Sequence, residues 1–273
     1  MTAAGTGTTW SSVSRSPKSP TLPLSLCCIV RNEVAFLPGL LRSVHGVVSQ
    51  VVVADTGSVD GTPELAREQG ATLVQTTWHD DFALARNIAV HAATQPWVLI
   101  LDADERLLYS GIRAIQRAVQ QPGVYALRIQ HTTLDGQVIT VPSWRPSLFQ
   151  PHVGLAFYGR VHEELRWHTE HGSVSPAYLP EGPHVTHLGY DPSLVVSRDK
   201  DARNLRLLEQ QLADTPGDAY VLLLMARHHL QAGRPFEAQQ WMLRCRLADT
   251  SKLQPVERSW LAHHAANSAM MRG

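Results

Sequence analysis

The sequence predicts an α/β protein, in which helices flank a mixed central sheet, followed by a C-terminal α-helical extension. Three observations support this fold class. Apolar runs of strand length alternate with segments of helical periodicity in the first part of the chain, a later stretch has the pattern of a β-hairpin, and the residues after about 193 keep only helical spacing. We expect a disordered leader over residues 1–22, one α/β domain over residues 23–190 and the helical extension over residues 191–273.

The leader is rich in Ser, Thr, Gly and Pro without a period. A βαβ unit follows, with strands over residues 25–30 and 50–54. Between them, four apolar side chains recur at helical spacing: Leu37, Leu40, Leu41 and Val44. A short helix is expected over residues 63–69, because a proline suits its first turn and a glycine follows its last residue. Residues 72–75 then return to the sheet.

The next elements continue the alternation. A helix from about Asp81 precedes a continuous apolar run over residues 97–101, which is typical of a strand buried on both faces. A further helix is expected over residues 110–120. The pattern then becomes that of a β-hairpin, with strands over residues 124–130 and 138–141 joined by an Asp-Gly turn.

The end of the chain contains one helical hairpin with the spacing of a tetratricopeptide-like unit. Its characteristic residues are Leu222, Met225, Ala226, His229, Gly233, Ala238, Met242 and Cys245. Such repeats usually need about three units to bury their faces, and only one matches well. The sequence therefore favours a plain helical extension, and the alternative is a small array completed by helices over residues 199–212 and 255–271.

The composition excludes several classes of partner. Lys plus Arg total 24 and Asp plus Glu total 24, so no overall basic field exists to gather nucleic acid or an anionic membrane. No run approaches the roughly 18 apolar residues of a membrane-spanning helix. Cys27 and Cys28 are adjacent and Cys245 is distant, so the three cysteines do not form a disulfide framework. A cytoplasmic protein is expected.

Two acidic residues follow the apolar run over residues 97–101, at the strand end where ligands of open α/β sheets bind. Asp102 and Asp104 are one residue apart, so in an extended strand end both carboxylates project to one side, with Cα atoms about 7 Å apart. Mg²⁺ or Mn²⁺ prefers one or two carboxylates together with substrate phosphates. The alternative is an acidic loop that caps a helix.

Other polar residues follow neighbouring elements. Asp55 ends a buried strand, and Gly57 and Gly61 let the next loop approach a ligand closely. The Asp55 carboxylate can accept hydrogen bonds from a base or a ribose, or it can belong to a polar turn before a helix. Arg86 can hold a phosphate with two hydrogen bonds or form a surface salt bridge, and Asn87 is expected to support the same loop.

Four segments occur in a fixed order and spacing: residues 28–33 (Cys-Ile-Val-Arg-Asn-Glu), 53–62 (Val-Ala-Asp-Thr-Gly-Ser-Val-Asp-Gly-Thr), 85–87 (Ala-Arg-Asn) and 101–105 (Leu-Asp-Ala-Asp-Glu). Together they resemble the inverting glycosyltransferases of family 2, and the resemblance extends over about residues 24–187. It implies a GT-A-type nucleotide-diphospho-sugar transferase fold. It also implies transfer of a sugar, with inversion, from a nucleotide-diphosphate donor that we expect to be a uridine-diphosphate (UDP) sugar.

The resemblance also assigns residues to the donor and to the metal. The implied donor-binding residues are Ile29, Arg31, Asn32, Glu33, Asp55, Ser58, Asp60, Arg86, Asp102 and Ala103. In the family, the first acid of the last segment contacts the ribose and the last acid binds the metal, which implies these roles for Asp102 and Asp104. We include Asp102 and His187 with Asp104 as ligands of Mg²⁺ or Mn²⁺. His187 and His184 belong to a segment similar to one in relatives, and the alternative for each is a core histidine.

Residues 159–164, Gly-Arg-Val-His-Glu-Glu, resemble a further segment of this family. Inversion requires a base that removes the acceptor proton. Glu163 is the first candidate and Glu164 the next, while His162 either acts as the base or packs beneath the loop. Arg145 lies in a Trp-Arg-Pro-Ser-Leu-Phe stretch that resembles the acceptor-side strand, where an arginine can guide a phosphate or the acceptor.

The acceptor stays open between a glycan, a lipid-linked sugar and a peptide, and the helical extension suits a protein partner. A second hypothesis is a non-catalytic binding module that keeps the nucleotide-sugar fold as a scaffold and docks a partner with its helical end. A nucleotidyltransferase is a third, but the first strand is not followed by a glycine-rich triphosphate loop. A zinc enzyme is not expected, because no histidine pair has zinc-ligand spacing.

Overall fold

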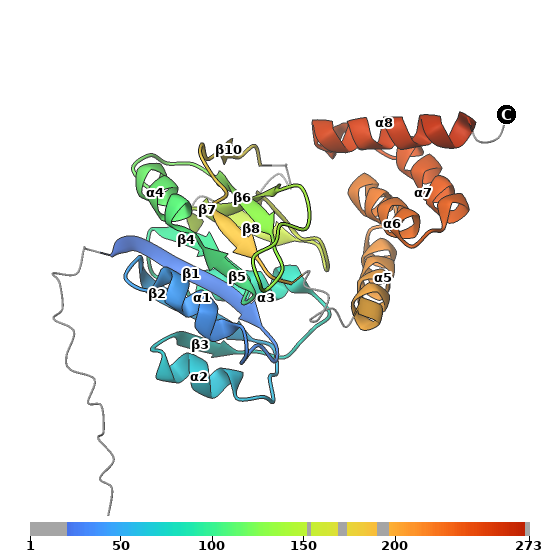
Figure 1. Cartoon of the computed structure of the whole chain (residues 1–273). Helices are drawn as coiled ribbons and strands as arrows, with labels where there is room; N and C mark the ends of the chain where they lie inside the picture. Colours follow the sequence, from blue (N-terminus) through green and yellow to red (C-terminus); the bar gives the residue numbers. More distant parts are fainter. Residues whose placement is uncertain (1–20, 152–153, 169–173, 190–196, 271–273) are drawn as a thin grey trace, which may run out of the picture.

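The computed structural model describes residues 21–151, 154–168, 174–189 and 197–270. Its strands are β1 Leu22–Val30, β2 Val48–Asp55, β3 Thr72–Gln75, β4 Trp97–Ile100, β5 Glu105–Leu107, β6 Tyr125–His131, β7 Ser143–Phe149, β8 Leu155–Tyr158, β9 Glu164–Trp167, β10 Ala177–Tyr178 and β11 Val185–His187. Its helices are α1 Leu37–Val44, α2 Thr62–Glu68, α3 Phe82–His91, α4 Tyr109–Ala118, α5 Ser197–Asp214, α6 Ala219–Gln231, α7 Pro235–Leu247 and α8 Pro255–Met270. Helices α5 to α8 stand beside the sheet-containing part as a second group (Figure 1).

One large sheet has the strand order β3-β2-β1-β4-β7-β6-β11-β5, and β10 pairs with β6 beside this path. Strand β1 is parallel to β2 and β4, whereas β7 is antiparallel to β4 and β6. The predicted mixed sheet is therefore confirmed. Strands β8 and β9 form a separate antiparallel pair.

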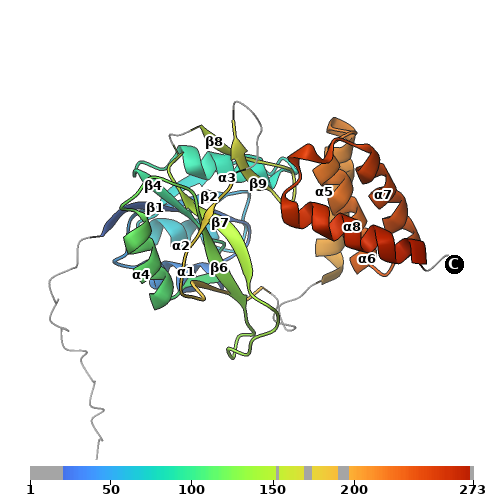
Figure 2. The ribbon, with the colours of Figure 1, turned by 90° about the horizontal axis from the view of Figure 1, so that it is seen from above.

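The central strands are buried on both faces, which explains their uninterrupted apolar sequence. In β4, Leu99 packs into one hydrophobic cluster, while Val98 and Ile100 pack into another. The first cluster includes residues of α1, α2 and α4, and the second includes residues of α3, β8 and β9. Figure 2 shows α3 close to β8 and β9. Two layers of cover thus hold the strand ends in place.

Most predicted elements match the observed ones to within a few residues, but the hairpin was predicted wrongly. Its turn is present, with Gly136 in the left-handed region at φ 87°. Residues 138–141 do not form the returning strand, and the described pairing there is one isolated bridge between Thr132 and Val138. The alternating side chains are not covered by a second layer, since Val141 is 86% exposed. Instead β7 pairs with β6, and neither β5 nor the strands β8 to β11 were predicted.

The predicted leader falls largely outside the described residues, which begin at 21, and β1 already starts at Leu22. None of the helices in the described ranges combines the length and the apolar composition needed to cross a bilayer.

The extension consists of α5 to α8, so its predicted helical character is confirmed. Helices α6 and α7 pack around a cluster that includes Leu222, Ala226, Ala238, Met242 and Cys245. A second cluster joins the extension to the loop between β8 and β9, and it contains Val161, Leu207, Leu208, Leu224 and Met225. The sequence favours a plain helical extension over a true repeat array, and this choice stays a prediction.

Polar contacts reinforce the junction between the two parts. Arg206 of α5 donates two hydrogen bonds to Asp80, and Arg160 donates two to Asp214. Tyr220 of α6 donates from its hydroxyl to the His162 carbonyl at 3.2 Å. The loop between β8 and β9 is therefore held by the helical extension.

Candidate active site

Most of the predicted donor-binding residues, and the predicted metal ligand Asp104, lie at or just after the carboxyl ends of three adjacent parallel strands, β1, β2 and β4. Val30 of β1 is opposite Asp55 of β2, and Cys27 of β1 is opposite Ile100 of β4. The loops after these strands consequently emerge at one edge of the sheet, where open α/β sheets bind ligands.

Hydrogen bonds join the loop after β1 to the loop after β2. Asn32 has a left-handed φ of 58°, its N–H donates to Ser58 Oγ at 2.8 Å, and its Oδ1 accepts from Val59 N at 2.8 Å. Asp60 Oδ2 accepts from Val34 N at 3.1 Å. Asn32, Ser58 and Asp60 thus order the two loops, and their direct contacts with a donor stay predictions.

Asp55 lies beneath the second loop and is only 2% exposed. Its carboxylate accepts hydrogen bonds from the backbone N–H of Gly57 at 3.3 Å and Ser58 at 3.2 Å, and from the Ser58 hydroxyl. These contacts shape the loop, so a contact with ribose or base stays a prediction. Among the other predicted donor residues, Arg31 is exposed and Ile29 is partly buried.

The acidic segment after β4 is a turn rather than the expected extended strand end, because Glu105 N donates to the Asp102 carbonyl at 2.9 Å. Asp102 and Asp104 are partly exposed, while Ala103 and Glu105 between and after them are buried. Glu105 accepts from Asp102 N at 2.9 Å and from Arg145 Nη2 at 2.6 Å. The buried glutamate therefore fixes the turn that presents the two aspartates.

Both oxygens of Asp102 are paired with arginines. Oδ1 lies 3.0 Å from Arg86 Nη2, and Oδ2 lies 3.0 Å from Arg145 Nη1. Burial alone would raise the pKa of Asp102, but the two guanidiniums hold that pKa well below its usual range. Asp102 is therefore a permanently ionised anchor between two arginines.

Asp104 has a different set of neighbours. Its Oδ2 is 3.1 Å from Nε2 of His187, whose Nδ1 lies 2.9 Å from Nδ1 of His131. Burial opposes protonation of His187, but the hydrogen bond to Asp104 raises its pKa above the ordinary value. A Cβ atom at Gly189 would come within 2.3 Å of Asp104 Oδ2, so the absence of a side chain there leaves room for this pair.

Glu33 faces the same acidic edge. Its burial, followed by the negative charges of Asp104 and Asp102, raises the pKa of Glu33 to about 7. An edge that raises a carboxyl pKa in this way has an excess of negative potential, and a cation bound there would relieve it.

The side chains at this edge suit a hard divalent cation only if oxygen atoms of a bound substrate supply the remaining ligands. Within the described ranges, no three His, Cys, Asp or Glu side chains gather to hold a metal ion. Asp104 is 26% exposed at its side chain, and among the described residues its ion pair is with His187 instead of an arginine or lysine. One carboxylate plus phosphate oxygens is a common set for Mg²⁺, so Asp104 fits this role and Asp102 fits it less well.

The predicted base, Glu163, lies in the loop between β8 and β9. Arg86 of α3 donates from Nε to Glu163 Oε1 and thereby connects it to Asp102. Asn87 fixes the strand next to this loop, with hydrogen bonds of 2.9 and 2.8 Å to the backbone of Phe157. Its predicted supporting contact is thus present.

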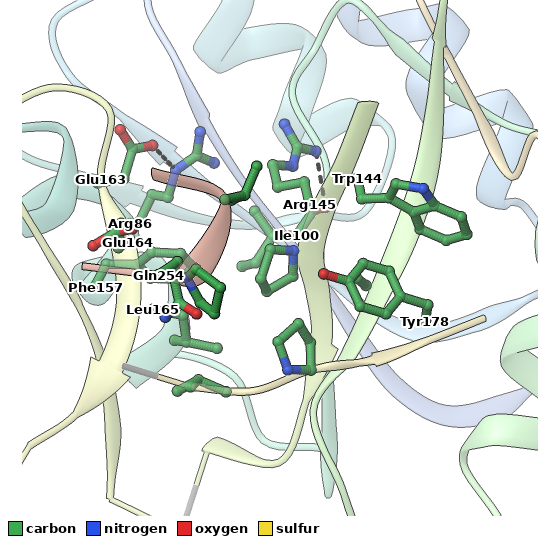
Figure 3. Close-up of a pocket in the computed structure, with 16 residues that line it drawn as sticks. Arg86, Ile100, Trp144, Arg145, Phe157, Glu163, Glu164, Leu165, Tyr178 and Gln254 are labelled. Carbon is green, nitrogen blue, oxygen red and sulfur yellow. Dashed lines mark hydrogen bonds and ion pairs between the residues drawn. The ribbon is translucent and has the colours of Figure 1, made fainter. Parts of the chain in front are cut away.

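Glu163 lines a pocket of about 400 Å³. Figure 3 shows Glu163 and Arg86 on one side of it and Trp144 and Tyr178 on the other. His162 does not belong to the lining; its neighbouring charges besides Glu163 are those of His228, Arg227 and Lys200 in the extension. Of the two base candidates, Glu163 is therefore the one that faces the pocket.

The remaining candidates have structural partners. Glu164 pairs with Arg166 at 2.9 Å, and burial raises the pKa of Glu164. His184 is fully buried, accepts from Arg128 N at 2.9 Å and lies 3.2 Å from the Pro180 carbonyl, which is the core role weighed for it.

Sequence reasoning missed several residues of this region. Arg145 was noted only as a possible guide for phosphate or acceptor, and its ion pairs with Asp102 and Glu105 had no local signal. The pocket residues Tyr178 and Gln254 were also missed. They come from distant parts of the chain, so only the folded arrangement brings them together.

A mixed α/β sheet with acidic residues at the ends of parallel strands defines an open α/β protein whose ligand site lies at that edge of the sheet. Residues 25–172, more than half of the chain, match the model of Glycosyl transferase family 2. The chain belongs to glycosyl transferase family 2.

The chain is also similar to curated proteins and to solved structures. A TPR repeat-containing protein of Synechococcus elongatus is 35% identical over 250 residues, which cover 89% of this chain and 60% of that protein. The SPbeta prophage-derived glycosyltransferase SunS of Bacillus subtilis is 24% identical over 77% of this chain and 50% of its own. This chain thus spans 50 to 60% of the length of these relatives. The structure of S. aureus TarS 1–349 in complex with UDP-GlcNAc aligns over 90% of this chain and 88% of its own, with a TM-score of 0.49 and 13% identity.

Proposed function

We propose that this chain transfers a sugar, with metal assistance and inversion, from a nucleotide-diphosphate donor to an acceptor hydroxyl or thiol. The observation that carries the proposal is the connection of Glu163 through Arg86 to Asp102. It joins a carboxylate that faces a pocket to the acidic turn at the end of β4. Membership of glycosyl transferase family 2 supports the type of reaction.

The donor is assigned to the edge formed by the loops after β1 and β2 and the turn after β4. Arg86 Nη1 is buried and lacks a hydrogen-bond partner among the described residues. A buried unsatisfied donor costs about 1–3 kcal/mol, and a diphosphate oxygen would satisfy it. This supports a UDP sugar or a related donor with its diphosphate near Arg86.

Mg²⁺ or Mn²⁺ would be held by Asp104, beside His187, together with phosphate oxygens of the donor. When bound, the ion would neutralise charge on the departing diphosphate. Asp102 keeps the arginines in place and is left to contact the ribose. The negative charges at this edge help to raise the pKa of Glu33 to about 7. This excess of negative charge supports a bound cation here.

In the proposed step, the acceptor oxygen or sulfur attacks the anomeric carbon and its proton passes to Glu163. A bond forms between the acceptor and the sugar while the bond between the sugar and the diphosphate oxygen breaks, and its electron pair leaves with the nucleoside diphosphate. Arg86 fixes Glu163 through Oε1, which leaves Oε2 to receive the proton.

The proposal is tested by nucleoside-diphosphate release from a panel of nucleotide sugars in the presence of Mn²⁺. Asp104→Asn and Glu163→Gln are expected to lower the rate at least a hundredfold, and EDTA should abolish it. Thermal unfolding of each variant checks that the fold is kept. If the intact chain releases no nucleotide from any sugar of the panel, the catalytic proposal is wrong.

A second candidate is the non-catalytic scaffold, and exposed apolar side chains on α7 favour it. Phe236, Leu243 and Leu247 are 78, 57 and 80% exposed, which suits contact with a protein partner. UDP with Mn²⁺ should raise the melting temperature if the donor site is intact, and no nucleotide should do so for a scaffold. The three free buried cysteines fit a reducing compartment, so the cytoplasm remains our prediction.

A further inference from the structure

The pocket that Glu163 faces is lined mostly by apolar side chains. Phe157, Leu165, Ile100 and Trp144 contribute to its wall, together with three prolines at positions 146, 176 and 255. Trp144 and Tyr178 contact each other edge to face, with ring centroids 5.1 Å apart, and both are substantially exposed. Exposed aromatic rings beside a pocket are typical of surfaces that bind an apolar group.

The helical extension supplies one side of this pocket. Gln254, Pro255 and Val256 line it; Gln254 directly precedes α8, and the other two are its first residues. Their position is fixed by Glu257, which is only 7% exposed and accepts from Gln254 N at 2.8 Å. The short segment is thus held rigidly by a helix cap, although Val256 itself is 71% exposed.

The charged groups around the pocket are already paired. Arg86 contacts Glu163 and Asp102, and Arg145 contacts Asp102 and Glu105. Two guanidiniums therefore share three carboxylates, so no surplus positive charge is left for an anionic acceptor group. Apart from these ion pairs and that of Glu164, the polar side-chain groups of the lining are those of Gln254, the Tyr178 hydroxyl and the Trp144 indole N–H.

We propose that the acceptor is a polypeptide segment with an apolar side chain next to its accepting Ser, Thr or Cys, and that residues 254–256 of the extension help to bind that side chain. The inference rests on the proposed function, because Glu163 marks the place of the accepting atom. With this role for residues 254–256, the helical extension forms part of the acceptor site.

Three features favour a peptide over other acceptors. A saccharide buried here would leave most of its hydroxyls without partners, which costs free energy for each one. A lipid-linked phosphate would find both arginines of the lining in ion pairs, and the remaining Arg86 Nη1 is already assigned to the diphosphate of the donor. A pocket of about 400 Å³ with aromatic and proline walls has the size and shape for one or two side chains of an extended peptide.

The test measures binding, so that it does not depend on catalysis. Dye-labelled heptapeptides with one central Ser or Cys in a Gly background, and with Leu, Phe, Asp or Lys beside it, are titrated with the full chain in UDP and Mn²⁺. Fluorescence anisotropy should show Leu and Phe peptides binding at least about tenfold more tightly than Asp and Lys peptides.

Val256→Asp should remove this preference, because it places a charge against the apolar side chain. Leu247→Asp is the matched control, since Leu247 is also exposed, lies in the same extension and does not line the pocket. It should change peptide affinity less than twofold. Both changes are at exposed positions, and equal melting temperatures will show that the fold is kept.

Equal affinities for all peptides, or equal effects of the two variants, would overturn the inference. So would binding of methyl glycosides or of vesicles with anionic lipid when no peptide binds. Nucleotide release without peptide selectivity would overturn the inference and keep the proposed function. Selective peptide binding without any nucleotide release or sugar transfer would keep the pocket's specificity and overturn the catalytic proposal.

Discussion

Arg86 and Glu163 are 77 residues apart in the sequence, yet Arg86 donates directly from Nε to the Glu163 carboxylate. Its Nη2 lies 3.0 Å from Asp102 Oδ1. One guanidinium, 10% exposed at its side chain, therefore serves two carboxylates on different elements. Stability and the proposed chemistry depend on the same residue.

Arg86→Ala should destabilise the protein by about 3–5 kcal/mol, because it leaves the largely buried Glu163 carboxylate without a counter-ion and removes one of the two arginines that pair with Asp102. The free energy of unfolding in urea measures this. Arg67→Ala is the control, since Arg67 and its partner Glu64 are 51 and 66% exposed, and such pairs contribute at most about 1 kcal/mol. Similar losses for the two variants would contradict the structural role of Arg86.

Gly189→Ala should disturb the contact between Asp104 and His187, because the new Cβ would lie 2.3 Å from Asp104 Oδ2. We expect a lower affinity for UDP in Mn²⁺, measured by calorimetry, with a smaller effect when Mn²⁺ is omitted. Gly217→Ala introduces the same methyl group where no atom lies within 4 Å and should leave affinity unchanged. An unchanged affinity in Gly189→Ala would argue against a metal on Asp104.

Glu33 should make stability depend on pH. The pKa of Glu33 is raised from 4.5 to about 7 in the folded chain, so the folded state holds this proton more tightly. This contribution is complete below pH 4.5 and is lost as pH rises through 7. Since Glu33 is partly exposed, we expect only about 1–2 kcal/mol.

Glu33→Gln removes this titration. The difference in unfolding free energy between the variant and the original chain should therefore change between pH 5 and pH 8, in favour of the variant at pH 8. Urea unfolding at several pH values provides the measurement, and parallel profiles would show that Glu33 has an ordinary pKa.

Leu207→Ala tests the junction between the extension and the α/β part. Leu207 is fully buried in the cluster that contains Val161, so its truncation should cost about 2–5 kcal/mol. Nucleotide release should fall as well, because Val161 is two residues before Glu163. Leu243→Ala, at a position 57% exposed, is the control and should have little effect on either measurement.

The order of strands β1 to β4 and helices α1 to α4 was predictable, because these elements carry their own periodicity or helix-end signals. The helix Leu37–Val44 was predicted from the helical spacing of its four apolar residues, and all four lie within the observed helix. Residues 138–141, Val-Ile-Thr-Val, were wrongly predicted as a strand, because a run of β-branched residues indicates a strand only where a second layer covers one face. Strand β5 is three residues long and has no periodicity to detect.

The site was predictable in part for a similar reason. Asp102 and Asp104 directly follow a buried strand, so their place at the sheet edge follows from local sequence. The ion pairs of Arg145 and the proximity of Gln254 to Glu163 depend on how distant elements pack, and a single sequence contains no local sign of such contacts.

The loop between β8 and β9 touches both parts of the molecule at once: Val161 is packed against α5 and α6, and Glu163 faces the pocket. Its conformation is therefore matched to these particular helices. In a chimaera with foreign helices after residue 190, the loop between β8 and β9 would not fit the new helices. An active chimaera should therefore also receive, in place of residues 159–164, the loop that belongs to those helices.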